Sequence, residues 1–230
     1  NGRMEVRPVL LSWRGGKDCL MALERLRDVP DWQIVGLLTT VNRRHDRVAM
    51  HGIRRDVLEA QAAALGLSLV VAEMDWPGSN EAYLQSWHKA LDETQARWPG
   101  LEHCAFGDIH LADVRAWREQ QMREHGWNSV FPLWGEDTGR LARHFIDAGH
   151  RATLVCVDTQ QLGAAFCGRA FDDTLLTELP DGIDACGENG EFHTLTHGGP
   201  LFRSDLFLVA GESVLRDERF QFQDYHLADD

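Results

Sequence analysis

The sequence has few cysteines, no long apolar run and a deficit of positive charge. Its 230 residues include five cysteines, which are scattered and never form a C-x-x-C pair. That pattern is typical of reduced cytosolic thiols, and it disfavours both a disulfide framework and a zinc knuckle. No apolar stretch approaches the roughly 20 residues of a membrane span, and the N-terminal residues show no signal-peptide pattern. We therefore expect a cytoplasmic protein with no membrane partner.

The charge balance argues against a general affinity for nucleic acid. The 23 lysines and arginines are outnumbered by 36 aspartates and glutamates, which leaves a net charge of −13. Such a chain lacks the broad positive field that non-specific nucleic-acid binding needs. The composition is otherwise that of an ordinary globular protein, long enough for one large domain or a domain with a smaller companion.

Short apolar runs alternate with helix-spaced segments through the first two thirds of the chain. The predicted strands are residues 8–13, 33–41, 67–72, 103–106, 129–131 and 153–157, and the predicted helices are residues 19–30, 54–65, 80–97, 113–125 and 138–149. Helical connections between short buried strands predict a mostly parallel, doubly wound sheet of the α/β class.

The alternation of strands and helices stops near residue 158. Residues 160–184 are loop-like with one short helix at 172–178, and alternating stretches at 204–210 and 216–225 predict an antiparallel ribbon. We therefore divide the chain into an α/β domain at residues 1–158 and a smaller C-terminal α+β subdomain at residues 159–230.

Residues 10–19 carry the most informative motif, L-L-S-W-R-G-G-K-D-C, between the first predicted strand and the first helix. Two glycines permit a tight turn and a close approach to a ligand, and the helix N-terminus presents amides to an anion. Lys17 adds a charge suited to phosphate. The motif is neither a P-loop nor a dinucleotide fingerprint. A plain turn would also accommodate Gly-Gly, but Lys17 and Asp18 directly behind favour a phosphate-binding loop.

This motif resembles the S-G-G-K-D-S loop of the ATP pyrophosphatase (PP-loop) superfamily, whose members cleave ATP between the α and β phosphates. Three further segments follow it in order: V-A-M-H-G at 48–52, F-G-D at 106–108 and G-E-N-G-E-F-H-T at 187–194. Together they are similar to the diphthine–ammonia ligase (diphthamide synthase domain) family, over nearly the whole chain. We identify the chain as a short, single-unit member of that family.

The resemblance implies an ATP-dependent ligase that adenylates a carboxylate, releases AMP and pyrophosphate, and forms an amide with ammonia. Its cofactors would be ATP and Mg²⁺. In the family the acceptor is diphthine in translation elongation factor 2, whereas this sequence shows no acceptor, which could be a small molecule or a protein. A homo-oligomer is compatible with the sequence.

The resemblance also implies site residues. The nucleotide would contact Ser12, Arg14, Gly15, Gly16, Lys17, Asp18, Cys19, Thr39 and Thr40, with Asp18 ordering Mg²⁺. The substrates would contact Met50, His51, Gly52, Gly107, Asn189, His193 and Thr194. Catalysis would depend on Lys17, Asp108, Glu188 and Glu191.

Some of these residues have plainer interpretations. Gly187 and Gly190 would let the chain bend so that Glu188 and Glu191 face one cleft, where they could position an amine, accept its proton or hold Mg²⁺ through water. A solvated acidic turn is the alternative. Asp18 and Asp108 could instead cap helices, and Thr39 and Thr40 could be structural.

The loop departs from the superfamily pattern at Arg14 and Cys19, which stand where serines are expected. A serine hydroxyl donates well to phosphate, whereas a thiol donates weakly. The first alternative function is therefore a nucleotide-binding module without turnover, and the second is a PP-loop enzyme acting on tRNA. A reactive Cys19 thiol of lowered pKa, and a zinc site at His193 and His197, are weaker hypotheses.

Overall fold

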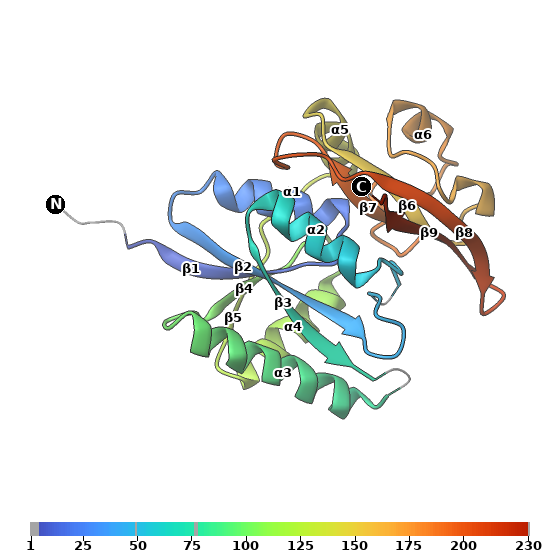
Figure 1. The fold of residues 1–230 in the computed structure, drawn as a ribbon. Coiled ribbons are helices and arrows are strands. Elements are labelled where there is room, and N and C mark those ends of the chain that lie inside the picture. The colour runs from blue at the N-terminus through green and yellow to red at the C-terminus, as the bar shows by residue number, and fades with distance from the viewer. Residues whose placement is uncertain (1–4, 49, 76–77, 230) are drawn as a thin grey trace.

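The computed structural model describes residues 5–48, 50–75 and 78–229. Five strands form a first sheet in the order β3-β2-β1-β4-β5 (Figure 1). They are β1 (Arg7–Ser12), β2 (Trp32–Asn42), β3 (Ser68–Met74), β4 (His103–Ala105) and β5 (Asn128–Val130). All neighbours in this sheet are parallel. The predicted doubly wound α/β architecture is confirmed.

Helices cover both faces of this sheet (Figure 1). They are α1 (Lys17–Arg27), α2 (Arg55–Leu65), α3 (Asn80–Arg97) and α4 (Ala112–Glu124). Successive strand residues point to opposite faces, so Leu11 packs with Leu23 of α1, while Leu10 packs with Leu91 of α3. No helix among the described residues is long and apolar enough to cross a bilayer.

Short polar side chains and a glycine set several of the helix ends. The Ser79 hydroxyl accepts a hydrogen bond from the Ala82 amide at 3.1 Å and caps α3. The Asp137 carboxylate accepts one from the Arg140 amide at 2.9 Å and caps α5 (Thr138–Asp147). Gly66, at a φ of 71°, ends α2 in the left-handed conformation that glycine adopts without strain.

A second sheet of four antiparallel strands follows, in the order β7-β6-β9-β8. Its strands are β6 (Arg151–Asp158), β7 (Phe192–Gly198), β8 (Leu208–Arg216) and β9 (Phe220–Leu227), accompanied by the short helix α6 (Asp173–Glu178) and the 3-10 turn η1 (Ala164–Phe166). The predicted C-terminal ribbon is present as β8 and β9. Its first strand begins at Leu208, later than expected.

The strand predicted at residues 153–157 is present, but its predicted place in the parallel sheet is wrong. Residues 153–157 lie in β6, which pairs antiparallel with β7 and β9 in the second sheet. A strand buried on both faces has no alternation, so its sequence does not reveal the direction of its neighbours. Leu11 of the first sheet and Leu154 of the second share one hydrophobic core. The expected division at residue 158 stays a prediction.

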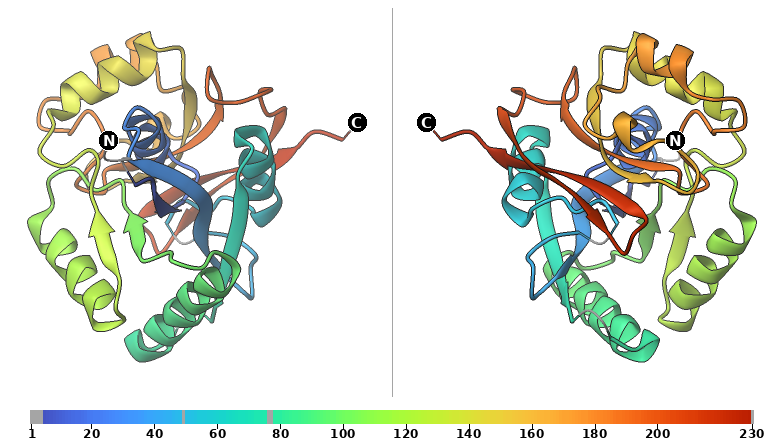
Figure 2. Two further views of the ribbon diagram at one scale, coloured as in Figure 1. Left: turned by 90° about the vertical axis from the view of Figure 1, so that its left-hand side faces the viewer. Right: turned by 90° about the vertical axis from the view of Figure 1, so that its right-hand side faces the viewer.

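The β8–β9 ribbon extends beside α2 (Figure 2). Asp224 of β9 pairs with Arg54 at the start of α2, at 2.7 Å, and with Arg47 in the loop before it, at 3.0 Å. These hydrogen bonds lower the pKa of Asp224 to about 2. The ribbon is therefore tied to the loop that connects β2 to α2.

Candidate active site

A cleft of about 500 Å³ opens where the strand order of the first sheet reverses, at the carboxyl ends of β1 and β4. Ligands of open α/β sheets bind at this position. The lining comprises Ser12, Arg14, Gly16, Lys17, Asp18, Cys19, His51, Phe106, Gly107, Asp108, Leu111, Val114, Arg118, Gly187, Glu188, Asn189, Gly190, Phe192, His193 and Thr194. The cleft therefore brings together residues of all four motif segments, around positions 16, 51, 107 and 190.

Gly15 fixes the shape of the loop after β1. Its φ is 84°, and a Cβ there would lie 2.8 Å from Ile53 Cδ1. Its carbonyl accepts hydrogen bonds from the Thr196 amide at 2.8 Å and from Gln61 Nε2 at 3.0 Å. Gln61 is fully buried and also accepts from the Trp13 indole. Gln61 was not predicted as a site residue; its signal in the sequence is an amide on the apolar face of α2.

The first turn of α1 forms one wall of the cleft. Gly16 is its N-cap and supplies no side-chain acceptor, but Thr194 Oγ1 accepts from the Lys17 amide at 3.0 Å. A Cβ on Gly16 would lie 3.1 Å from both His51 Nε2 and the Thr194 carbonyl. This helix N-terminus, with its positive dipole end at the cleft, is suited to bind an anion.

The Lys17 ammonium lies at the base of the cleft and is 3% exposed. It donates to the Cys186 carbonyl and, at 3.0 Å, to Asp18 Oδ1. Burial by itself would lower the pKa of Lys17, but the adjacent Asp18 carboxylate raises it overall. The side chain therefore remains charged, and it joins α1 to the loop that precedes β7.

Two carboxyl groups in the cleft are perturbed by burial. Desolvation raises the pKa of Asp18, against the opposing charge of Lys17, and it also raises the pKa of Glu188. Glu188 Oε1 accepts from the Ile109 amide at 2.9 Å, which connects the loop before β7 to the loop after β4. Both acids line the cleft, as the sequence predicted.

Glu191 does not line the cleft, so the prediction that both carboxylates face it is wrong for this residue. Gly187 and Gly190 both have positive φ, and the turn they make directs Glu191 inward, where it is 1% exposed. Glu191 Oε2 accepts from the Asp184 amide at 2.6 Å. The residue closes the loop at 184–191, and its catalytic role stays a prediction.

Two arginines face the cleft from opposite sides. Arg14 follows β1, and burial together with the charge of Arg118 lowers the pKa of Arg14. Arg118 of α4 lies with its Nε 2.7 Å from Asp108 Oδ2 and its guanidinium over the Phe106 ring. Arg118 was not predicted as a site residue, because one arginine on a charged helix has no distinguishing pattern.

Two histidines are in ring contact at the cleft wall, with their planes tilted by 48°. The rings of His51 and His193 are 4.7 Å apart between centroids. Burial, with the charges of Arg14 and Lys17, lowers the pKa of His193 to about 4, so its imidazole is neutral near pH 7. The described residues contain one histidine–carboxylate group with metal-ligand geometry, and neither His193 nor His197 belongs to it.

Cys19 is buried at the cleft edge, where its thiol donates to the Gly16 carbonyl at 3.1 Å. Burial raises the pKa of this thiol to about 11. The hypothesis of a thiol activated by a lowered pKa is therefore wrong, because desolvation, together with the charge of Asp18, outweighs the backbone hydrogen bonds that favour the thiolate.

Several expected contact residues lie outside this cleft. Met50 is 41% exposed, and neither it nor Gly52 and Thr39 contributes to the lining; Ala49 of the same motif lies outside the described residues. Thr40 lines a smaller neighbouring pocket. That pocket shares Ser12, Arg14, Phe106 and Arg118 with the cleft and is otherwise walled by Trp13, Leu38, Tyr83, Leu84, Trp87, Trp117, Gln121 and Met122.

Two family models account for most of the chain. Residues 7–129 match the diphthamide synthase N-terminal domain, and residues 137–223 match the diphthamide synthase C-terminal domain. The chain belongs to the diphthamide synthase family. The junction of the two models lies between the last parallel strand and α5, and the cleft of this diphthamide synthase family member combines residues from both.

Curated relatives are distant. The chain is 25% identical to the diphthine–ammonia ligase of Schizosaccharomyces pombe over 154 residues, 65% of this chain and 25% of that protein. It is 31% identical to the diphthine–ammonia ligase of Danio rerio over 94 residues, 37% of this chain and 36% of that protein. A solved U34-tRNA thiolase from Methanococcus maripaludis with its [4Fe-4S] cluster aligns with a TM-score of 0.38 at 16% identity, covering 62% of this chain and 58% of the thiolase.

Proposed function

We propose that this protein is an ATP-dependent ligase that activates a carboxylate as its adenylate and converts it to an amide with ammonia. Family membership supports ATP use, and the names of the two curated relatives support amide formation. The acceptor is a carboxylate on a small molecule or on a protein.

The observation that carries the proposal is the junction of the glycine loop (residues 12–19) with the late motif (G-E-N-G-E-F-H-T, residues 187–194). Thr194 Oγ1 binds the amide of Lys17, 177 residues away, and Glu188 lines the same cleft as the N-terminus of α1. A phosphate-binding helix end and an acid are thus neighbours. A ligase requires that combination, because the ammonia nitrogen must reach the acyl carbon whose oxygen carries the adenylate.

We assign the phosphates of ATP to the loop at residues 12–19, because Gly16, Lys17 and Asp18 line the cleft at the N-terminus of α1, whereas Gly15 faces the interior and shapes the loop. We assign the adenine ring to the side of the smaller pocket, which has aromatic walls and shares Ser12 and Arg14 with that loop; its side chains would have to move to admit the ring. Asp18 would hold Mg²⁺, which takes one or two carboxylates and otherwise water or phosphate oxygens.

The proposed reaction has two steps. A carboxylate oxygen attacks the α-phosphorus of ATP, pyrophosphate leaves with the bonding electrons, and an acyl-adenylate forms. The ammonia nitrogen then attacks the acyl carbon, AMP leaves, and the nitrogen loses a proton. We assign that proton to Glu188, because burial raises its pKa toward the range in which a general base works best.

The test is product analysis with a trapped intermediate. ATP, Mg²⁺, hydroxylamine and a set of carboxylates would be incubated with the protein, and the nucleotides separated by chromatography. We expect AMP and pyrophosphate, formed only when an acceptor is present, together with the acceptor's hydroxamate.

The other outcomes distinguish the alternatives. ADP formation that Lys17→Ala abolishes would contradict the proposed mechanism. Tight ATP binding without ATP cleavage would favour the nucleotide-binding module without turnover, above all if Arg14→Ser and Cys19→Ser restore cleavage. A gel shift of tRNA would favour an RNA substrate.

A further inference from the structure

A histidine–carboxylate cluster lies outside the cleft, between the two parts of the chain. Glu24 belongs to α1, His144 to α5, and His150 to the turn that precedes β6. His150 Nε2 donates to Glu24 Oε2 at 2.7 Å, and His144 Nε2 donates to Glu24 Oε1. The candidate ligand atoms all lie within 4.8 Å of one another.

We infer that Glu24, His144 and His150 form a binding site for a divalent transition metal, of which Zn²⁺ fits best. Two imidazoles and one carboxylate are a ligand set that zinc accepts, and it leaves a fourth position for water. The His144 side chain is 47% exposed, so water can reach that position.

The His150–Glu24 pair is already close to the spacing that a zinc ion requires. Ligand atoms at 2.0–2.2 Å from a tetrahedral zinc ion are about 3.4 Å apart, so His150 Nε2 and Glu24 Oε2 need separate by less than about 1 Å. The His150 side chain is fully buried and lies 5.3 Å from the Phe145 ring, which limits its freedom.

Metal binding would replace two hydrogen bonds. The imidazole protons that now bind Glu24 would move to the Nδ1 atoms, and that of His144 would meet solvent. His150 Nδ1 is buried without a hydrogen-bond partner among the described residues, so its proton would find no acceptor. The affinity is therefore lower than that of a closed structural zinc site.

The position of the site gives it a role beyond local stability. Glu24 lies on the helix that begins at the phosphate loop, and His144 lies on the helix that begins at Thr138. The Thr138 hydroxyl donates to Asp184 at 2.7 Å, and Asp184 accepts the amide of Glu188 at 3.1 Å. A metal ion at this site would clamp together the two helices that support opposite walls of the cleft.

The test is metal titration of the intact protein after dialysis against a chelator. We expect one equivalent of Zn²⁺ by calorimetry, a melting temperature that rises with Zn²⁺ concentration, and a tetrahedral visible spectrum with Co²⁺. Glu24→Gln and His144→Ala should each weaken Zn²⁺ binding more than tenfold. Losing only the outer hydrogen-bond partner of a metal ligand already costs roughly 10–100-fold in affinity, and these variants remove a ligand itself.

His125→Ala is the matched control, because His125 stacks on His88 and pairs with Asp92 in a second, separate histidine cluster. It should leave Zn²⁺ affinity unchanged. The proposal is overturned if the protein takes up no Zn²⁺, or if His125→Ala weakens binding as much as His144→Ala. It is also overturned if Glu24→Gln lowers the melting temperature without changing the Zn²⁺ response, since the cluster is then only a hydrogen-bonded bridge.

Discussion

At the scale of single residues, Lys17 has two roles that compete for the same ammonium group. It is the cation that the phosphate-loop hypothesis needs, yet its Nζ is bound to the Cys186 carbonyl and to Asp18. Binding of a phosphate therefore requires Lys17 to exchange one of these partners. Because the Cys186 carbonyl belongs to the loop before β7, this exchange would change a hydrogen bond of that loop. Nucleotide binding is thereby coupled to the segment that carries Glu188.

Lys17→Ala should weaken ATP binding by about 1.5–3 kcal/mol, the range for a hydrogen bond to a charged group, while AMP binding stays nearly unchanged. It should also lower the melting temperature, because the buried Cys186 carbonyl loses its donor. Calorimetry with ATP and AMP measures the first effect. Lys89→Ala, which removes the one other lysine of the sequence from the exposed face of α3, is the control. Equal losses for ATP and AMP would place Lys17 away from the β and γ phosphates.

The two glutamates of the late motif should respond in opposite ways. Glu188→Gln should leave ATP binding and stability intact and reduce amide formation at least about tenfold, because it removes the proposed base. Glu191→Ala should destabilise the fold by about 1–3 kcal/mol, since the Asp184 amide is left unsatisfied. Urea unfolding and product assays on both variants test this. If the Glu191→Ala protein is as stable as wild type and has lost only its activity, Glu191 has a catalytic role and not a structural one.

At the scale of elements, the turn between β1 and α1 depends on the absence of a side chain. Gly15→Ala should destabilise the protein by about 1–3 kcal/mol, the usual cost of overpacking, because the new methyl group meets Ile53 and Gln61. Gly135→Ala is a matched control, with a φ of 77° and no atom within 4 Å of the added Cβ. The difference between the two melting temperatures isolates the contact from the backbone strain. Equal losses would mean that the loop has room to move.

The sequence predicted these elements well where local rules decide them. The helices expected at residues 80–97 and 138–149 are present as α3 and α5, and the loop with Gly15 and Gly16 joins the first strand to the first helix. Residues whose role depends on distant partners were missed, including Gln61 and Arg118. The inward direction of Glu191 was also missed, because side-chain direction in a glycine turn follows no sequence period. Likewise, the strand at 153–157 was recognised but assigned to the wrong sheet.

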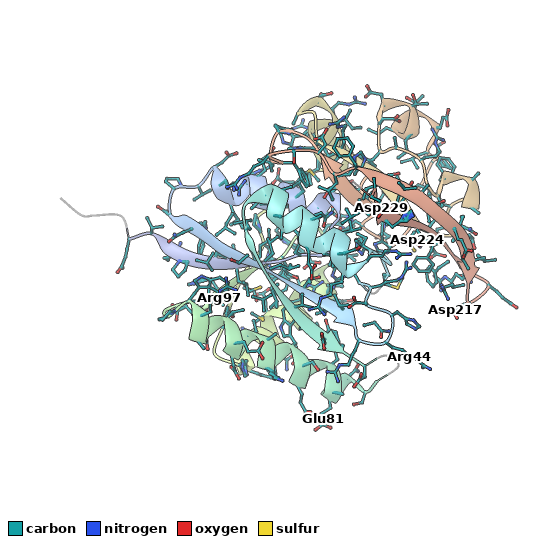
Figure 3. The ribbon with its side chains drawn as sticks, viewed as in Figure 1. Arg44, Glu81, Arg97, Asp217, Asp224 and Asp229 are labelled. Carbon is teal, nitrogen blue, oxygen red and sulfur yellow. The ribbon has the colours of Figure 1, made fainter. Side chains whose placement is uncertain are left out.

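At the scale of the whole molecule, ion pairs join the C-terminal ribbon to the first part of the chain. Figure 3 labels Asp224 on β9, beside α2, and Asp217 in the turn at the far end of the ribbon. Asp224 is 19% exposed and faces Arg47 and Arg54. Asp224 therefore stabilises the fold by joining segments that are about 170 residues apart in sequence.

Asp224→Asn should cost on the order of 2 kcal/mol of stability at pH 7, since the folded pKa of about 2 lies below the ordinary 3.8. A lowered folded pKa stabilises the protein above the unfolded value, and that stabilisation is lost as the pH falls toward 2. The difference between wild type and variant should therefore be roughly halved near pH 3. Urea unfolding from pH 7 to pH 3 measures it, with Asp217→Asn as control. A difference that does not change with pH would show that the ion pairs are not its source.

The hydrogen bonds of the Gly15 carbonyl set an order of events during synthesis. Its partners are Gln61 of α2 and the Thr196 amide of β7, so the loop reaches its final shape only after β7 has left the ribosome. A nascent chain that ends before residue 196 contains the whole glycine motif and the whole parallel sheet, yet it lacks the contact that holds the loop. We expect the ability to bind nucleotide to arise late in translation, when the last third of the chain folds back onto the first turn of α1.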